Sequence, residues 1–347
     1  MYKIIRPLLF KLQAEIIHHI IINMLCILRY VPMARVFMRA IFSLKSPKLH
    51  KEVFGLKFPN PIGLAAGFDK NAEVFDMLGD MGFGFIEIGT VTPKEQDGNP
   101  KPRIFRLPLD KGLINRMGFN NKGVLNAASN IRKRKKRPII GGNIGKNTST
   151  PNEDAPNDYL KTFRALYDYV DYFTVNVSCP NVANLCGLQN KDNTVKILNV
   201  LRDFRKGQTD YRPILLKISP DLTKEQVDVM IEVVKECKID GIVAANTTTS
   251  RDGLITDKAI VDEFANGGLS GAPLTNRTLE MVKYIHNETE GTIPIIGVGG
   301  IMTAQDAINL MDAGASLVQI YSGFIYDGPM LPRKICNRLI TNDISEE

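Results

Sequence analysis

Eight short runs of apolar, largely β-branched residues recur along the chain and are separated by helical patterns. Most of these runs are continuous in hydrophobicity, which is typical of parallel strands that are buried on both faces. The predicted strands are 61–64, 85–88, 139–144, 172–176, 214–218, 241–245, 293–297 and 317–320. The helical stretches between them include 72–81, 158–170, 224–237 and 304–313.

The number of units indicates one architecture. Eight strand–helix units in about 290 residues match the count and length of a (β/α)8 TIM barrel. The alternative, a doubly wound open sheet, usually has a GxGxxG turn after its first strand. The turn at 65–70 reads Ala-Ala-Gly-Phe-Asp-Lys and lacks that spacing. We therefore predict an α/β fold with a (β/α)8 TIM barrel over residues 46–347 and an N-terminal two-helix extension over residues 1–45, called the arm below.

The arm differs from the rest of the chain in charge. Residues 1–51 hold nine Lys or Arg and one acid, Glu15, whereas the remainder holds 35 basic and 36 acidic residues. Helices are predicted at 15–29 and 33–44, with a break at Pro32. The longest apolar run, 16–28, is shorter than the roughly 20 residues that a bilayer requires. Two readings stay open: helices lying on a membrane surface, or a helical cap on the barrel.

Composition excludes several other classes of protein. A nucleic-acid enzyme would carry basic charge over a groove, and the near-neutral body has no such excess, so no nucleic-acid partner is predicted. The five cysteines are odd in number and show no CxxC spacing. A disulfide framework and a metal site are therefore not predicted.

Active sites of TIM barrels lie at the C-terminal ends of the strands, and asparagines recur at these ends in this sequence. They are Asn143, Asn176, Asn181 and Asn246. Amide side chains both donate and accept hydrogen bonds, so a ring of them suits a planar heterocycle. The glycine-rich segments 297–300 and 321–323 follow the last two strands, where barrels often bind phosphate. Simple tight turns are the alternative reading of these segments.

Two further residues carry candidate chemistry. Lys217 lies inside the predicted strand 214–218. An unpaired buried ammonium group is costly, which favours a functional role as the partner of a negative charge that forms during a reaction. Cys179 directly follows a strand. A lone cysteine is more often buried and inert, so for Cys179 the functional and structural readings both remain open.

Several ordered motifs resemble those of the dihydroorotate dehydrogenase family, across nearly the whole chain. They are Leu64-Ala65-Ala66-Gly67-Phe68-Asp69-Lys70, Ile88-Gly89-Thr90-Val91-Thr92, Asn115-Arg116-Met117-Gly118-Phe119-Asn120-Asn121, Asn143-Ile144-Gly145-Lys146-Asn147, Asn176-Val177-Ser178-Cys179-Pro180-Asn181, Lys217, Asn246-Thr247-Thr248, Gly267-Gly268-Leu269-Ser270-Gly271, Gly297-Val298-Gly299-Gly300 and Tyr321-Ser322-Gly323. The arm resembles the extension of the membrane-associated, quinone-using class.

The resemblance implies a set of ligands and the residues that bind them. FMN would be held by Ala66, Gly67, Thr90, Asn143, Asn176, Lys217, Ala245, Ser270, Gly271, Gly300, Tyr321 and Ser322. Dihydroorotate would be bound by Lys70, Asn115, Arg116, Met117, Gly118, Phe119, Asn176, Asn181, Asn246 and Thr247. A membrane quinone would meet His18, Arg106 and Tyr321. No metal and no obligate protein partner are implied.

By the same resemblance, the enzyme would oxidise dihydroorotate to orotate in de novo pyrimidine (UMP) biosynthesis, at the cytoplasmic face of the inner membrane and peripherally bound to it. Cys179 would be the catalytic base that removes a proton from the substrate. Membrane-associated members usually have serine there, and cysteine is usual in soluble members. A soluble enzyme that uses fumarate or NAD is therefore the alternative. A non-catalytic flavin-binding barrel is the alternative from another class of protein.

Overall fold

The computed structural model describes residues 2–133, 138–178, 191–264 and 266–343. Eight parallel strands close into a barrel in the order β3, β4, β7, β8, β9, β10, β12, β13 and back to β3. Their bounds are Ile62–Leu64, Phe85–Val91, Ile139–Ile144, Tyr172–Asn176, Ile214–Ile218, Gly241–Ala244, Ile295–Val298 and Leu317–Ile320. The predicted (β/α)8 barrel is confirmed, and every predicted strand is present to within three residues.

Alternation along the strands sorts side chains between two cores. Residues two apart on a strand share a face, and a small cluster of inward-facing residues fills the barrel: Phe58, Ala65, Phe85, Tyr172, Leu215, Val243, Ile296, Val298 and Leu317. The intervening residues pack outward against the helices. Two glycines leave space for the aromatic rings of this cluster. A Cβ atom on Gly63 would lie 2.3 Å from the Phe85 ring, and one on Gly141 would lie 2.2 Å from the Tyr172 ring.

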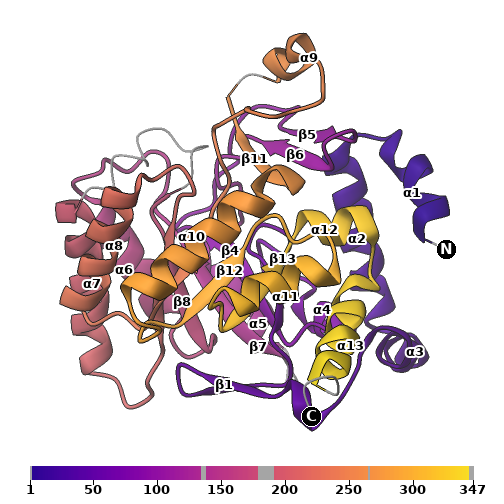
Figure 1. Ribbon diagram of the computed structural model, residues 1–347. Helices are drawn as coiled ribbons and strands as arrows, with labels where there is room; N and C mark the ends of the chain where they lie inside the picture. The colour runs from indigo at the N-terminus through magenta and orange to yellow at the C-terminus, as the bar shows by residue number, and fades with distance from the viewer. Residues whose placement is uncertain (1, 134–137, 179–190, 265, 344–347) are drawn as a thin grey trace.

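Helices surround the barrel (Figure 1). They are α4 (Phe75–Asp80), α5 (Val124–Arg132), α6 (Ala155–Leu166), α7 (Lys191–Lys206), α8 (Lys224–Glu236), α10 (Thr275–Glu288), α11 (Ala304–Asp312), α12 (Ser322–Asp327) and α13 (Leu331–Asp343). Helix α4 begins three residues after its predicted start. The Asp69 carboxylate accepts hydrogen bonds from the backbone N–H groups of Glu73 and Val74, and Ala72 has a left-handed φ of 56°. A turn therefore occupies the segment where helix was predicted.

Several elements were not predicted from the sequence. The hairpin β1 (Lys51–Val53) and β2 (Leu56–Phe58) places Phe58 in the cluster that fills the barrel. An antiparallel sheet of β5 (Ile104–Leu107), β6 (Gly112–Asn115) and β11 (Gly268–Gly271) lies at the top in Figure 1, below α9 (Lys258–Glu263). Short 3-10 helices span Pro47–Leu49 and Ala272–Leu274. Strand β11 pairs with β6 although more than 150 residues separate them in the chain, and local patterns do not reveal such a pairing.

The arm forms helices α1 (Tyr2–Phe10), α2 (Ala14–Leu28) and α3 (Pro32–Phe42), on the right in Figure 1. The two predicted helices are α2 and α3, and α1 precedes them. Among the described residues, no single helix has the length and apolar character needed to cross a membrane. Helices α2 and α3 meet that test only as a pair, and they are bent by 117° at the break between them.

Ion pairs attach the arm to the barrel. Arg29 contacts Asp76 at 2.9 Å, and Arg39 contacts Asp80 at 2.9 Å. Arg35 pairs with Asp80 at 2.5 Å. Both aspartates lie on α4. Part of the basic excess of the arm is therefore matched by acidic groups of the barrel.

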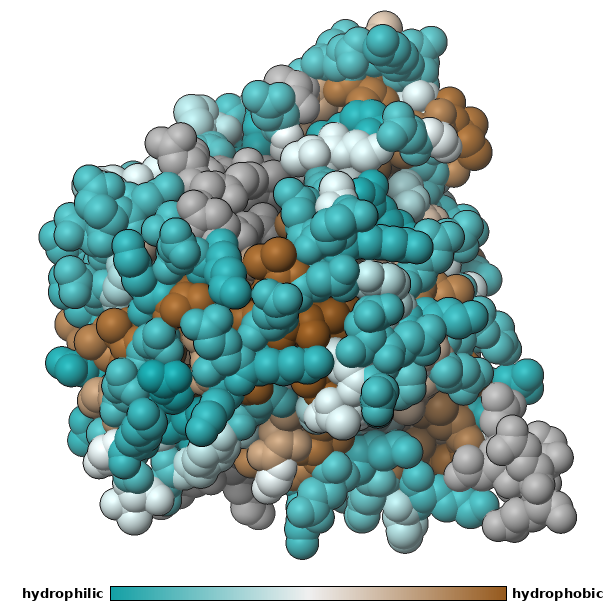
Figure 2. All heavy atoms as spheres, turned by 60° about the vertical axis from the view of Figure 1, so that its left-hand side comes forward, coloured by the Kyte–Doolittle hydropathy of each residue, from teal (hydrophilic) through white to brown (hydrophobic). Residues whose placement is uncertain are grey.

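Exposed apolar side chains are concentrated on the arm. Of the 19 exposed large hydrophobic residues in the described part of the chain, 14 lie between residues 4 and 41. By contrast, the face that carries α6, α7 and α8 is mostly hydrophilic (Figure 2). Contiguous exposed apolar surface of this kind is typical of an interaction surface, and packing on the barrel does not account for it.

Candidate active site

A cavity of about 600 Å³ lies between the arm and the C-terminal ends of the barrel strands. Its arm side is lined by apolar residues of α1 and α2, among them Ile5, Leu9, Ile17, Ile21 and Met24. Its barrel side is lined by polar side chains and glycines from the strand ends. The cavity thus joins an apolar half to a polar half, and it matches the place that the strand-end rule predicts.

The polar half is built on a chain of hydrogen-bonded amide and hydroxyl groups. Thr90 Oγ1 donates to Asn143 Oδ1 at 2.6 Å, and Asn176 Nδ2 donates to Thr90 Oγ1 at 3.1 Å. Asn246 Nδ2 donates to Asn176 Oδ1 at 3.1 Å and to Ser178 Oγ at 3.0 Å. These residues come from β4, β7, β8 and the segments after β8 and β10. The network therefore fixes side chains of β4, β7 and β8 and of the segments after β8 and β10 relative to one another.

A buried carboxylate below this network was missed by the sequence analysis. Glu87 is inaccessible to solvent. It accepts hydrogen bonds from Asn143 Nδ2 at 2.8 Å, Thr174 Oγ1 at 3.0 Å and Gln319 Nε2 at 2.8 Å. The only sequence signal is a charged residue within an apolar strand, two positions after Phe85. Glu87 orients Asn143, which lies behind the cavity wall and does not line it.

Strand alternation explains why Lys217 faces the cavity. Leu215 belongs to the inward-facing cluster, and Lys217 is two residues later on β9. Its side chain is 6% exposed and lines the cavity. Ser178 Oγ donates to the Lys217 carbonyl at 2.9 Å. Lys217 thus lies at the floor of the polar half, on a buried strand as the sequence predicted.

Glycines shape the side of the cavity predicted to hold phosphate. Gly300 has a φ of 74°, and a Cβ atom there would lie 2.3 Å from the Thr275 backbone. Gly271 has a φ of 101°, and a Cβ atom would lie 2.3 Å from the Lys111 carbonyl oxygen. Between these loops, Ser270 Oγ and Ser322 Oγ are 2.9 Å apart. Only glycine fits both positions, so the backbone itself forms this wall.

The residues present fit a planar heterocycle with an anionic tail. Gln319 lines the cavity, and its buried Oε1 has no hydrogen-bond partner among the described residues. A buried acceptor of this kind is rare and calls for a ligand or water. All of the predicted cofactor-binding residues except Asn143 line the cavity: Ala66, Gly67, Thr90, Asn176, Lys217, Ala245, Ser270, Gly271, Gly300, Tyr321 and Ser322.

Most of the predicted substrate-binding residues also line the cavity. They are Lys70, Asn115, Met117, Gly118, Phe119, Asn176, Asn246 and Thr247. Lys70 Nζ donates to Asn120 Oδ1 at 2.7 Å, which ties the segment after β3 to the segment after β6. Arg116 does not line the cavity, because its guanidinium donates to the carbonyl oxygens of Pro102 and Phe264. Cys179 and Asn181 lie outside the described residues.

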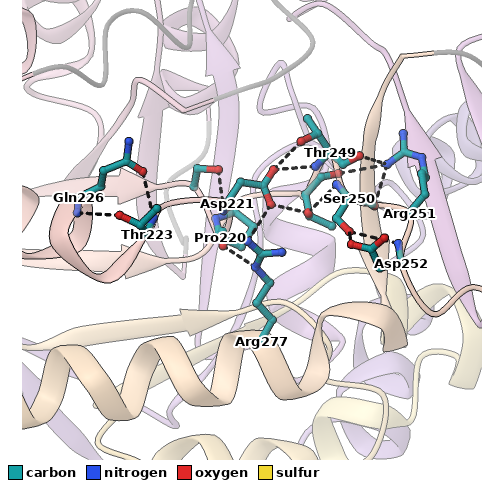
Figure 3. A network of polar contacts seen from close by, with 11 residues as sticks. Pro220, Asp221, Thr223, Gln226, Thr249, Ser250, Arg251, Asp252 and Arg277 are labelled. Atoms are coloured by element: carbon teal, nitrogen blue, oxygen red, sulfur yellow. Dashed lines mark hydrogen bonds and ion pairs between the residues drawn. The ribbon is translucent and has the colours of Figure 1, made fainter.

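A second hydrogen-bond network holds the segment after β10 (Figure 3). The Asp221 carboxylate accepts from the Thr249 backbone N–H at 2.7 Å, from Thr249 Oγ1 at 2.8 Å and from Thr248 Oγ1. Arg277 of α10 approaches Asp221 at 3.4 Å and donates to the Pro220 carbonyl. Asp221 therefore clamps the residues that directly follow Asn246 and Thr247. Its place after a strand could have suggested this role, but its partners could not be inferred from the sequence.

The apolar half of the cavity contains the three predicted quinone contacts, His18, Arg106 and Tyr321. Phe68 lies between two of them: its ring centroid is 5.0 Å from that of His18 and 6.1 Å from that of Tyr321. Arg106 donates to the Leu12 carbonyl at 2.6 Å. Phe68, to which the sequence analysis assigned no role, thus bridges the arm and the barrel.

Burial controls the charge of these groups. It lowers the pKa of His18 to about 3, and the positive charges of Lys70 and His19 act in the same direction. His18 is only half-buried because it faces the cavity, yet protein surrounds it, so the neutral imidazole is the form we expect near neutral pH. Burial raises the pKa of Tyr321 to about 12. Near neutral pH these two side chains therefore present uncharged hydrogen-bonding groups.

Comparisons with known proteins agree with this geometry. The family model for dihydroorotate dehydrogenase matches residues 48–342. A dihydroorotate dehydrogenase (quinone) from Christiangramia forsetii is 52% identical over 98% of this chain and 99% of its own length. A protein of the same name from Methylobacillus flagellatus is 45% identical, with the same coverage. The crystal structure of DHODH from Eimeria tenella in complex with ferulenol matches with a TM-score of 0.81 and 34% identity, covering 90% of this chain and 92% of that one.

Proposed function

The chain belongs to the dihydroorotate dehydrogenase family, and we propose that it oxidises dihydroorotate to orotate in pyrimidine biosynthesis with a quinone as electron acceptor. Near-full-length identity of 52% and 45% to quinone-type relatives supports this activity. The observation that carries the proposal is the cavity of about 600 Å³, whose polar half lies at the strand ends and whose apolar half lies under the arm. A polar substrate and an apolar acceptor can each be accommodated there.

The cofactor of the proposed reaction is FMN. Lys217 and the amide network would hold its ring, and Ser322 and the loops that carry Gly271 and Gly300 would hold its phosphate. FMN, when bound, supplies the two-electron redox chemistry that links the two substrates. The Lys217 side chain lines the polar half and would stabilise negative charge on the reduced cofactor. Such a preoriented charge stabilises that state without reorganisation.

The side chains of the polar half would bind and orient dihydroorotate. The Lys70 ammonium would pair with the substrate carboxylate, since Lys70 lines the cavity and its Nζ is oriented by Asn120 Oδ1 at 2.7 Å. Asn115, Asn176 and Asn246 would match the alternating C=O and N–H groups of the pyrimidine ring. Cys179 would remove the C5 proton. A thiol is intrinsically more acidic than an alcohol, which makes it the easier base near neutral pH.

The arm would form the entry for the quinone and would hold the enzyme on the membrane. Its exposed apolar side chains between residues 4 and 41 would enter the lipid interface. We assign residues 1–45 to this arm and residues 46–347 to the FMN-binding barrel. In this arrangement the protein is a peripheral protein of the cytoplasmic face of the inner membrane.

The identity of the base does not overturn the choice of acceptor. Cys179 had left a soluble, fumarate-using or NAD-using enzyme as the alternative. The relatives named above are quinone enzymes, and the match to the first of them covers 98% of this chain, arm included. The alternative is therefore not favoured. The arm represents far more added structure than the single atom that distinguishes cysteine from serine.

The test is an acceptor comparison with the purified, FMN-loaded protein. Dihydroorotate should bleach the flavin anaerobically, and a quinone analogue should restore its colour and sustain turnover. Fumarate and NAD should not sustain turnover. Turnover with fumarate or NAD but not with quinone would refute the proposed acceptor, and failure of dihydroorotate to bleach the flavin would refute the proposed activity.

A further inference from the structure

The acid of the arm is buried in an ion pair with the barrel. Glu15 lies in the first turn of α2 and is 3% exposed. Its Oε1 lies 2.7 Å from Arg103 Nη2, and Arg103 Nε donates to both carboxylate oxygens at 3.2 Å. Arg103 is itself buried. Breaking a buried, hydrogen-bonded pair of this kind leaves an uncompensated charge, so each member depends on the other for its position.

The remaining donors of Arg103 organise the loop that precedes β5. Its Nη1 donates to the carbonyl oxygens of Asp97 at 2.6 Å and Asn99 at 2.9 Å. Glu15 thus holds the guanidinium from one side, and the guanidinium holds the loop 97–103 from the other. The position of this loop is tied to α2 by a continuous set of hydrogen bonds.

The same loop is hydrogen-bonded to the proposed substrate-binding segment. Arg116 N–H donates to the Arg103 carbonyl at 2.9 Å, and Asn99 N–H donates to the Met117 carbonyl at 3.0 Å. Asn99 Nδ2 donates to the Arg116 carbonyl at 2.9 Å. A Cβ atom on Gly98 would lie 2.2 Å from the Met117 carbonyl oxygen, so the two backbones are in direct contact. Movement of the loop would therefore move the segment 115–120.

Charge is also shared across this region. The pKa of Glu15 lies below its usual value: burial acts to raise it, and the hydrogen bond and positive charge of Arg103 outweigh that effect. Lys101 and Lys70 lower it further. Glu15 is therefore ionised near neutral pH. Its charge also acts near Lys70, the proposed partner of the substrate carboxylate.

We propose that the Glu15–Arg103 ion pair is a positioning link through which helix α2 of the arm holds the dihydroorotate-binding segment 115–120 in place. The arm then contributes to substrate affinity as well as to the acceptor side. This inference rests on the proposed function, because it takes the segment 115–120 as the substrate-binding segment. Neither residue touches the substrate.

The test compares two variants that each break a buried ion pair between α2 and the barrel. Glu15→Gln breaks the link to the substrate segment. Asp76→Asn breaks the pair with Arg29 at the other end of the same helix, away from the loop 97–103. Orotate binding to each FMN-loaded protein is measured by calorimetry. Glu15→Gln should weaken binding by about tenfold, in the usual range of coupling between sites, and Asp76→Asn should leave it within about twofold of wild type.

A second readout separates positioning from general loss of stability. If the link contributes to orotate binding, then by thermodynamic reciprocity orotate must stabilise the docking of α2. Orotate should slow amide hydrogen exchange in α2 of the wild type and of Asp76→Asn, but not of Glu15→Gln. Glu15→Asp, which keeps the charge, should recover part of the lost affinity and provides a milder variant if Glu15→Gln folds poorly.

The outcomes distinguish this inference from the proposed function. If wild-type protein fails to bind orotate, the proposed function is wrong and the inference falls with it. If the wild type binds orotate and both Glu15→Gln and Glu15→Asp bind it with wild-type affinity, the positioning link alone is refuted. Equal losses of orotate affinity in Glu15→Gln and Asp76→Asn would also refute the link, since they would show only that binding requires a docked arm.

Discussion

The two-residue period of the strands decides which individual side chains reach the cavity. Glu87, Lys217 and Gln319 each follow an inward-facing apolar residue by two positions. Each would be costly to bury alone, and each is placed where polar partners or a ligand can compensate. A charged or amide residue at an inward-facing position of a buried strand is therefore the clearest indication of the site at the level of single residues.

At this scale, the base is tested by replacing Cys179 with alanine. Oxidation of dihydroorotate should slow by roughly a hundredfold to ten-thousandfold, the usual contribution of a positioned base. Bound FMN should remain, because the assigned cofactor contacts are made by other residues. Stopped-flow bleaching of the flavin measures the rate, and Cys237→Ala, which alters a buried thiol on the outer layer, is the control. Near-normal bleaching by Cys179→Ala would remove Cys179 from the mechanism.

The lowered pKa of His18 predicts a flat pH profile on the quinone side. With a pKa of about 3 in place of the usual 6.5, His18 stays neutral, so the KM for a quinone analogue should not vary between about pH 5.5 and 7.5. An inflection near the usual histidine pKa that disappears in His18→Gln would contradict this. The lowered pKa also affects the stability of the fold. The contribution of neutral His18 to the free energy of unfolding is fully present above pH 6.5 and is lost as the pH falls toward 3.

At the scale of elements, loops from neighbouring strands hold one another in place. Asp69 replaces the predicted first turn of α4 by accepting backbone N–H groups, and Asp221 clamps the segment after β10. Both carboxylates lie just after barrel strands, where the chain must turn into the site. Helix and strand patterns in the sequence locate these loops but do not determine which partners they contact.

The clamp predicts a binding defect without loss of the fold. Asp221→Ala should lower the free energy of unfolding by about 1–3 kcal/mol, since it leaves three donors without their acceptor. It should also weaken orotate binding, because Asn246 and Thr247 lose their support. The matched control is Asp228→Ala on α8. The Asp228 carboxylate accepts a hydrogen bond of 2.8 Å from the Tyr284 hydroxyl, and neither residue lines the cavity. Unchanged orotate affinity in Asp221→Ala would show that the clamp does not shape the site.

At the scale of the whole molecule, the arm adds an apolar half to the polar cavity at the strand ends of the barrel. Its helices cover the apolar half of the cavity and expose apolar side chains on their outer face. Arg29, Arg35 and Arg39 are engaged by Asp76 and Asp80 of α4. These arginines attach the arm to the barrel, so the proposed membrane attachment depends mainly on the apolar surface of the arm.

Charges introduced on that surface should release the protein from membranes. Ile20→Glu combined with Val36→Glu, at residues 50% and 56% exposed, should shift the protein from the vesicle-bound to the free fraction in co-sedimentation. Leu125→Glu, on a residue 77% exposed but on α5, should leave binding unchanged. Deletion of residues 1–42 should have the same effect as the arm variant and spare FMN binding. Persistent vesicle binding of both altered proteins would exclude the arm as the anchor.

Much of this protein is determined locally and is therefore readable from the sequence. The eight strands, α2, α3 and the barrel helices α4, α6, α8 and α11 follow from hydrophobic periodicity and length. Most of the binding residues that the resemblance to a family implied line the cavity. These predictions succeed because burial of a strand or helix face constrains every second or every third to fourth residue of a continuous segment.

What only the tertiary structure decided is how distant segments meet. The sheet of β5, β6 and β11, the Glu87 contacts, the Asp221 clamp and the Glu15–Arg103 pair each join residues that are far apart in the chain. No local pattern encodes such a pairing, because its stability arises only when burial removes competing water from both partners. The sequence thus determined the barrel and the polar residues at its strand ends, and the packing of the arm on the barrel decided how the two halves of the cavity are joined.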